Sequence, residues 1–190
     1  DHSIPLHSGY TFRTRSILRE QRKLGWETCN VTSDKHNQAA GKLESKETVD
    51  GLTFYRSRPF LHALSKVPVL NQWLISKGLE KRILEVAAIE NPDILHAHSP
   101  ALNGLAAVNA GRKLGLPVVY EVRAFWEDAA VDHGTTHEGS FRYNLTKSLE
   151  TYVLKKADAI TTICQGLKKD MELRGVPSAK ITPIPNAVDI

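Results

Sequence analysis

PDILHAHSPALNGLAAVNAGRKLGLPVVYEVRAFWED, residues 92–128, is the stretch of sequence that decides the fold. Two short apolar runs, Asp93–Ala97 and Val118–Val122, flank a segment with small and apolar residues at helical spacing, Ala101–Leu114. Gly115 predicts the end of this helix, and the β-branched second run is typical of a strand buried on both faces. The stretch therefore predicts a strand, a helix and a second strand, which form a βαβ unit.

Polar residues stand at the ends of both predicted strands. They are His96, His98 and Ser99 on the first, and Glu121, Arg123, Trp126, Glu127 and Asp128 on the second. Ligands of open parallel sheets bind outside the carboxyl ends of the strands, so these residues are the first candidates for a site. Because side chains alternate along a strand, His96 and His98 share one face, and Glu121 and Arg123 share another.

Strands and helices continue to alternate on both sides of this unit. Helices are predicted at Thr11–Leu24, Asn71–Glu90, Phe141–Lys156 and Gln165–Arg174, strands at Glu27–Thr32, Gly51–Arg56, Asp158–Ile163 and Lys180–Ile184, and loops at Ser33–Glu47 and Ala129–Gly139. The pattern predicts an α/β fold, a doubly wound and mostly parallel sheet with helices on both faces. We expect one Rossmann-like domain over residues 1–190, completed by a strand before Asp1.

Composition excludes several classes of protein. The chain of 190 residues has a formal charge of +4 and a pI near 9.1, and its basic residues are spread along the sequence rather than gathered in one stripe, which argues against a nucleic-acid partner. Cys29 and Cys164 have neither metal-knuckle nor disulfide-framework spacing, so we expect a cytoplasmic protein. No apolar run reaches the roughly 18 residues of a membrane span.

The first predicted helix begins directly after Ser8 and Gly9. Backbone N–H groups and the helix dipole favour a phosphate at such a position, although a plain loop has the same appearance. The same helix carries the basic residues Arg13, Arg15, Arg19, Arg22 and Lys23. They indicate either contact with an anionic membrane surface or acceptor, or a solvated helix face.

Four segments together resemble a known family. HAHSP, YEVRAFWED, ADAITTICQGL and IPNAVD occur in an order that resembles the N-terminal Rossmann-like half of a GT-B glycosyltransferase of family 4, and the last two also match it in spacing. The last two segments are the most specific. The resemblance implies a second Rossmann-like domain that binds most of the nucleotide-sugar donor and is absent here, so this fragment alone is expected to be inactive. It implies no cofactor, since the nucleotide sugar is a substrate.

The resemblance extends to individual positions. Gly9 matches the glycine of the loop near the donor phosphates, His98 the polar strand end that faces the cleft, and Asn186 the asparagine of a turn that ends the domain. Many family members have a second glycine before Gly9, a glycine at position 187 and a histidine near Arg123. This chain departs from the family pattern at all three places.

The predicted function is sugar transfer from a nucleotide-sugar donor to a saccharide or lipid-linked acceptor, with retention of configuration and with possible contact to the inner membrane face. The candidate residues are Arg123, Glu127 and Asp128 for catalysis, His98, Ser99, Glu121 and Trp126 for the acceptor cleft, and Ser8 and Gly9 for the donor phosphates. A guanidinium suits a diphosphate leaving group, and a carboxylate can orient or deprotonate the acceptor hydroxyl.

Two other functions fit the same residues. A metal-dependent hydrolase would use His96 and His98 together with His133 and His137 as ligands, although the chain is short for a (β/α)8 barrel of about 250 residues. A non-catalytic module that binds a sugar or a nucleotide is the other alternative.

Overall fold

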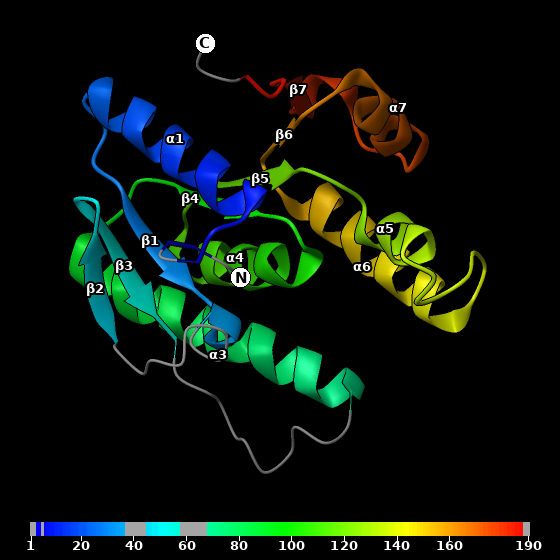
Figure 1. Ribbon diagram of the computed structural model, residues 1–190, viewed down its shortest axis with the longest axis horizontal. Helices are drawn as coiled ribbons and strands as arrows, with labels where there is room; N and C mark the ends of the chain where they lie inside the picture. Colours follow the sequence, from blue (N-terminus) through cyan, green and yellow to red (C-terminus); the bar gives the residue numbers. More distant parts are fainter. Residues whose placement is uncertain (1–2, 5, 37–44, 58–67, 188–190) are drawn as a thin grey trace. The chain divides into compact units, whose positions relative to one another are not determined.

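The computed structural model describes residues 3, 4, 6–36, 45–57 and 68–187. The chain divides into two compact units, Asp1–Asn91 and Pro92–Ile190. Figure 1 colours them in sequence order, from blue to green and from green to red. The expectation of one domain over the whole chain stays a prediction.

The first unit is built around a small mixed sheet. Its described elements are α1 (Gly9–Lys23), β1 (Cys29–Thr32), β2 (Lys46–Val49), β3 (Leu52–Arg56) and α3 (Pro68–Glu90). The strand order is β1-β3-β2, with β1 parallel and β2 antiparallel to β3. Both predicted helices and both predicted strands of this unit are confirmed, with their ends shifted by a few residues.

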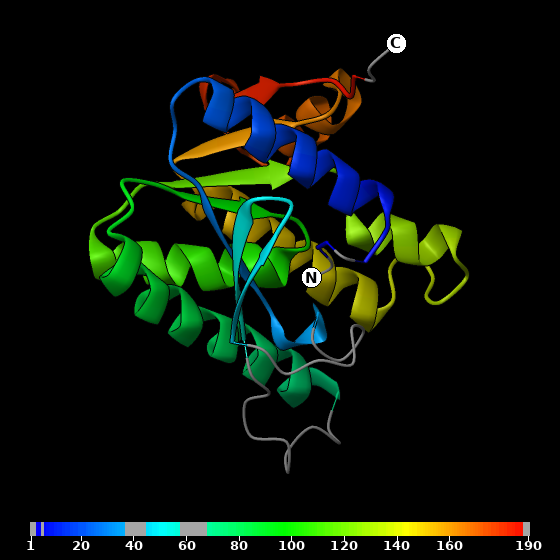
Figure 2. The ribbon, with the colours of Figure 1, turned by 60° about the vertical axis from the view of Figure 1, so that its left-hand side comes forward.

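Strand β2 corrects the prediction of a loop over Ser33–Glu47. Lys46 and Glu47 pair with β3 in a tight hairpin, which is seen in cyan in Figure 2. Asp50 and Gly51, both at positive φ, form the turn that joins the two strands. An Asp-Gly pair between extended segments is a strong hairpin signal, and it outweighs the polar character of β2.

The second unit contains a four-stranded, all-parallel sheet in the order β4-β5-β6-β7. Its elements are β4 (Leu95–His98), α4 (Ala101–Leu114), β5 (Val118–Val122), α5 (Trp126–Asp132), α6 (Phe141–Lys156), β6 (Ala159–Thr162), α7 (Gln165–Leu173), η2 (Ser178–Lys180) and β7 (Ile181–Pro183). Helices flank the strands, as Figures 1 and 2 show. The α/β, Rossmann-like fold class is confirmed. The helix α5 is a correction, because Ala129–Gly139 was predicted to be a loop.

Helix α4 packs tightly against the sheet through its glycines. A Cβ atom added at Gly104 would collide with Val153 and lie 2.8 Å from the Tyr120 ring, and one at Gly111 would lie 2.5 Å from Val118. Tyr120 and Val118 therefore point toward the helix. The residues that alternate with them on β5 point to the opposite face, and this face carries Glu121.

The parallel register brings the two polar strand ends to the same face. His98 pairs with Glu121, and His96 pairs with Val119, so the side chains of His96, His98 and Glu121 share the face turned away from α4. No helix in the described ranges is long and apolar enough to cross a membrane.

Candidate functional site

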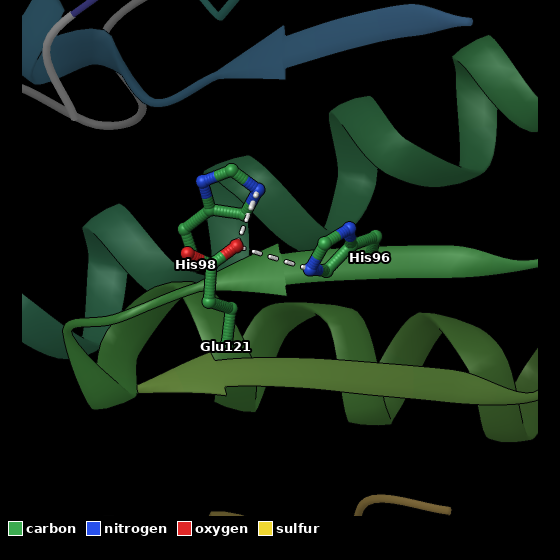
Figure 3. Close-up of side chains that lie close together, drawn as sticks. All are labelled: His96, His98 and Glu121. Atoms are coloured by element: carbon green, nitrogen blue, oxygen red, sulfur yellow. Dashed lines mark ion pairs between the residues drawn. The ribbon is translucent and has the colours of Figure 1, made fainter. Parts of the chain in front are cut away.

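A cluster of charged and polar side chains occupies this face of β4 and β5. Figure 3 shows the Glu121 carboxylate between the rings of His96 and His98. Oε2 of Glu121 lies 3.4 Å from Nε2 of His96 and 3.7 Å from Nε2 of His98. The Glu121 side chain is 2% exposed, whereas each ring keeps about a quarter of its surface exposed, 27% for His96 and 24% for His98.

Arg123 completes the cluster from the end of β5. Its Nε donates to Oε1 of Glu121 at 2.9 Å, and its Nη2 donates to Nδ1 of His98 at 2.6 Å. The Arg123 side chain is 4% exposed. A buried charge needs partners of this kind, and here the guanidinium has a carboxylate and an imidazole.

These contacts set the protonation states of the cluster. Burial raises the pKa of Glu121, but the hydrogen bond from His96 and the positive charge of Arg123 outweigh burial and hold that pKa well below its usual range. Burial lowers the pKa of His98 to about 3, and Arg123 and His96 act in the same direction. Near neutral pH the cluster therefore contains an ionised carboxylate, a guanidinium and a neutral His98.

The residues predicted to bind metal are only partly brought together. Among the described residues, His96, His98 and Glu121 form a group whose ligand atoms lie within 4.8 Å of one another, and His133 and His137 are not members of it. The Arg123 guanidinium contacts both Glu121 and His98, so a divalent cation there would meet a positive charge at hydrogen-bond distance from two of its ligands. The geometry thus disfavours the metal-dependent alternative.

Ser99 joins the ends of the two strands. Its backbone N–H donates to the carbonyl of Glu121 at 2.9 Å, and its Oγ accepts from the backbone N–H of Arg123 at 3.3 Å. Asn103 donates to the carbonyl of His98 at 3.1 Å. These bonds hold the backbone of the cluster in place beyond the last residue of β4.

The three remaining candidates lie together at the start of α5. Trp126 is 37% exposed, Asp128 is exposed, and Glu127 between them is buried. Oδ1 of Asp128 accepts from the Tyr143 hydroxyl at 2.9 Å. Burial raises the pKa of Tyr143 to about 12, and the bond to Asp128 adds to this effect. The first turn of α5 thus presents an aromatic ring and a carboxylate at the surface.

Glu127 belongs to a buried ion pair instead. Its Oε1 accepts from Nη1 of Arg174 at 2.6 Å, and the two side chains are 0% and 5% exposed. The Arg174 guanidinium also bonds Asp170 at 3.0 Å and lies 3.7 Å from the centre of the Phe125 ring. These contacts tie the start of α5 to α7. Glu127 therefore positions its neighbours Trp126 and Asp128.

Residues 8–187 match the model of the glycosyl transferase 4-like domain. The chain belongs to the glycosyl transferase 4-like family. One similar solved structure is a UDP-N-acetylglucosamine 2-epimerase from Rickettsia bellii, which is 10% identical and has a TM-score of 0.43. This match covers 67% of the present chain and 36% of the epimerase, so the matched part is about a third of that protein. A search of curated proteins found no match.

Two other residues of the predicted site, Ser8 and Gly9, lie in the first unit. They were predicted to bind the donor phosphates. Ser8 is the N-cap of α1, and its Oγ accepts from the backbone N–H of Thr11 at 3.2 Å. Gly9 is the first residue of the helix, and a Cβ atom at this position would meet nothing within 4 Å. The packing around Gly9 therefore does not require glycine.

The basic residues of α1 have partners within the first unit. Arg15 and Arg19 lie 2.9 and 3.6 Å from Asp50, and Arg22 donates to the carbonyl of Thr28 at 2.9 Å. These contacts fasten α1 to the β2–β3 turn. They favour the explanation that the basic residues of α1 form an ordinary solvated helix face. Contact with a membrane stays a prediction.

A polar cluster at the ends of β1 and β3 was missed by sequence reasoning. Arg56 is 1% exposed. Its Nε donates to the Glu47 carboxylate at 2.6 Å, and its Nη2 donates to the carbonyl of Ile4 at 2.8 Å. Nε2 of His36 lies 3.9 Å from the same carboxylate. The signal in the sequence was a polar residue at each strand end, Thr32 and Arg56, but the partners come from distant segments.

Proposed function

We propose that the protein is a glycosyltransferase that moves a sugar from a nucleotide-sugar donor to a saccharide or lipid-linked acceptor, with retention of configuration. The observation that carries this proposal is the buried network of Glu121, Arg123 and His98 at the carboxyl end of a parallel sheet. The network lies in a domain of the glycosyl transferase 4-like family. No cofactor is proposed.

The location and the charge of the network support a role in binding substrate. Burying charged side chains is costly unless they are paired, and apolar residues would stabilise a sheet as well or better. Ligands of open parallel sheets bind outside these strand ends. A guanidinium held there adds positive potential at the place where a diphosphate leaving group develops charge.

We assign different roles to the exposed and to the buried candidates. Asp128 is the exposed carboxylate of the group and is proposed to orient or deprotonate the acceptor hydroxyl. Trp126, also exposed, is proposed to form part of the acceptor cleft. Arg123 is proposed to act through its charge and Glu127 through the position of α5, since both side chains are buried.

Ser8 and Gly9 are proposed to approach the donor phosphates. The support is the start of a 15-residue helix, α1, whose dipole favours an anion, and the open space around Gly9. Because the Ser8 hydroxyl already accepts from Thr11, we assign the phosphate contact to the backbone at Gly9 rather than to the Ser8 side chain.

The test uses the protein together with the donor-binding domain that the family resemblance implies. It is incubated with a panel of uridine, guanosine and adenosine diphosphate sugars and with saccharide or lipid-linked acceptors. Release of nucleoside diphosphate and the acceptor mass are followed together. The proposal predicts that one donor loses its nucleotide and that the acceptor gains the mass of one sugar. Consumption of no donor with either class of acceptor would overturn it.

A further inference from the structure

We propose that Tyr143 positions the catalytic carboxylate: its hydroxyl fixes the side chain of Asp128, so that Oδ2 of Asp128 receives the acceptor hydroxyl. This inference rests on the glycosyl transfer proposed above, and it adds a residue that the sequence did not indicate. Asp128 lies in the first turn of α5 and Tyr143 in the first turn of α6. One hydrogen bond joins their side chains.

The chemistry of this contact defines which group donates. The Tyr143 hydroxyl lies 2.9 Å from Oδ1 of Asp128. A carboxylate can only accept, so the phenol donates its proton. Burial and the bond to Asp128 raise the pKa of Tyr143 to about 12, so the hydroxyl keeps this proton at any pH near neutrality. A hydrogen bond to a charged acceptor is stronger than one between neutral groups, which suits it to hold a side chain in one orientation.

Tyr143 is itself held in place by its surroundings. The residue is 6% exposed, and Nζ of Lys147 lies 5.6 Å from the centre of its ring. Its backbone N–H donates to Oγ of Ser140 at 3.1 Å, and this hydroxyl bonds Oγ1 of Thr136 at 2.8 Å. The phenol therefore cannot follow a moving carboxylate, and the carboxylate adopts the orientation that the phenol imposes.

Asp128, in contrast, is exposed and is held at one oxygen. Its side chain accepts from Tyr143 through Oδ1, and the described residues show no second hydrogen bond to this carboxylate. An exposed carboxylate without a partner populates several rotamers, which lowers the fraction of time that it spends facing a substrate. The bond to Tyr143 selects one of these rotamers. Oδ2 thus remains as the oxygen for the acceptor hydroxyl.

The packing of α5 has other supports besides this bond. Oε1 of Glu127 accepts from Nη1 of Arg174 at 2.6 Å, which ties the first turn of α5 to the end of α7. The carbonyl of Ala130 in α5 accepts from the backbone N–H and from Oγ1 of Thr135, at 2.9 and 3.0 Å. Loss of the phenol hydroxyl should therefore leave the helix in place and release only the carboxylate side chain. A positioning role can thus be separated by experiment from a purely structural one.

The orientation of Asp128 is measured by NMR in the uniformly labelled chain, without substrate. Three-bond couplings between Hα and the two Hβ protons of Asp128 report its χ1 rotamer. The proposal predicts couplings of a single rotamer in the parent chain and averaged couplings in Tyr143→Phe, which removes only the hydroxyl. Tyr152→Phe, at an exposed tyrosine of the same helix, is the control and should keep the parent values. Averaged couplings in the parent chain, or a single rotamer in Tyr143→Phe, would overturn the proposal.

The effect on catalysis is measured separately, with the protein that includes the donor-binding domain. Tyr143→Phe should lower kcat by about 10- to 100-fold and change KM for the donor by less than about twofold, because a misplaced group slows the chemical step without weakening donor binding. In the Asp128→Asn background the same substitution should change kcat by less than about twofold, since its effect passes through the carboxylate that this background lacks. Equal losses in both backgrounds, or no loss in the parent, would contradict the positioning role. A parent protein that consumes no nucleotide sugar would refute the proposed function but leave the NMR result standing.

Discussion

Glu150→Gln is predicted to make the second unit more stable at pH 8 and to change little at pH 5. Glu150 in α6 is 0% exposed, and its Oε1 accepts from the Tyr120 hydroxyl at 2.7 Å. Burial raises the pKa of Glu150 from its ordinary value near 4.5 to about 7. The charge of Glu127 adds to the increase, while the bond from Tyr120, the charge of Arg174 and the N–H of Ala101 oppose it.

The sign of the pH dependence follows from this raised pKa. Between pH 4.5 and pH 7 the folded protein binds a proton at Glu150 that the unfolded chain has released, so the free energy of unfolding falls as the pH rises. The full loss is about 3 kcal/mol, of which about 2.5 kcal/mol falls between pH 5 and pH 8. Gln cannot ionise and keeps the acceptor for Tyr120, so this loss disappears in the variant.

The assay is urea unfolding at pH 5 and pH 8, monitored by the fluorescence of Trp126. The sequence places one tryptophan, Trp126, within 92–190, so a background with Trp26→Phe and Trp73→Phe reports on this unit alone. Glu172→Gln, an exposed carboxylate on α7, is the matched control. If Glu150→Gln changes the free energy of unfolding equally at both pH values, Glu150 is ionised in the native protein and the reasoning fails.

Two further substitutions test the packing beneath the site. Arg174→Ala leaves Glu127 buried without its counter-ion and should lower the free energy of unfolding by about 3 to 5 kcal/mol, which urea unfolding measures. Gly104→Ala places a methyl group against Tyr120 and Val153 and should cost about 1 to 3 kcal/mol, visible as a lower melting temperature.

Two exposed positions elsewhere in the second unit provide the controls for these two changes. Arg142→Ala on α6 and Arg112→Ala in the last turn of α4 should each change stability by less than about 0.5 kcal/mol. If Arg174→Ala is as mild as Arg142→Ala, the ion pair with Glu127 contributes nothing to folding.

The central part of the fold could be predicted because local signals and tertiary structure agree there. The ranges of α4, β5 and α6 were predicted to the residue, since Gly115 and Pro117 mark one boundary and apolar periodicity marks the others. The hairpin formed by β2 and β3 was missed because a polar strand has a weak hydrophobic pattern, although the Asp50-Gly51 pair indicates its turn.

The site could be predicted only as a set of candidates. Position at the strand ends indicated His98, Glu121 and Arg123, but their contacts depend on the register between β4 and β5, which no local pattern encodes. The sequence also did not indicate that Glu127 is buried while Asp128 is exposed. It depends on Arg174, which lies 47 residues away from Glu127 along the chain.

Turnover of the Asp128→Asn variant tests the proposed site most directly. Asp128 is exposed, and Asn keeps an oxygen that can accept from Tyr143, so folding should be preserved while the carboxylate is lost. Asp132→Asn, an exposed position on the same helix, is the control. The account predicts that Asp128→Asn lowers sugar transfer by about 10²- to 10⁴-fold at unchanged melting temperature, while Asp132→Asn keeps the parent rate. Parent-level transfer by Asp128→Asn would contradict the assignment of this site to catalysis.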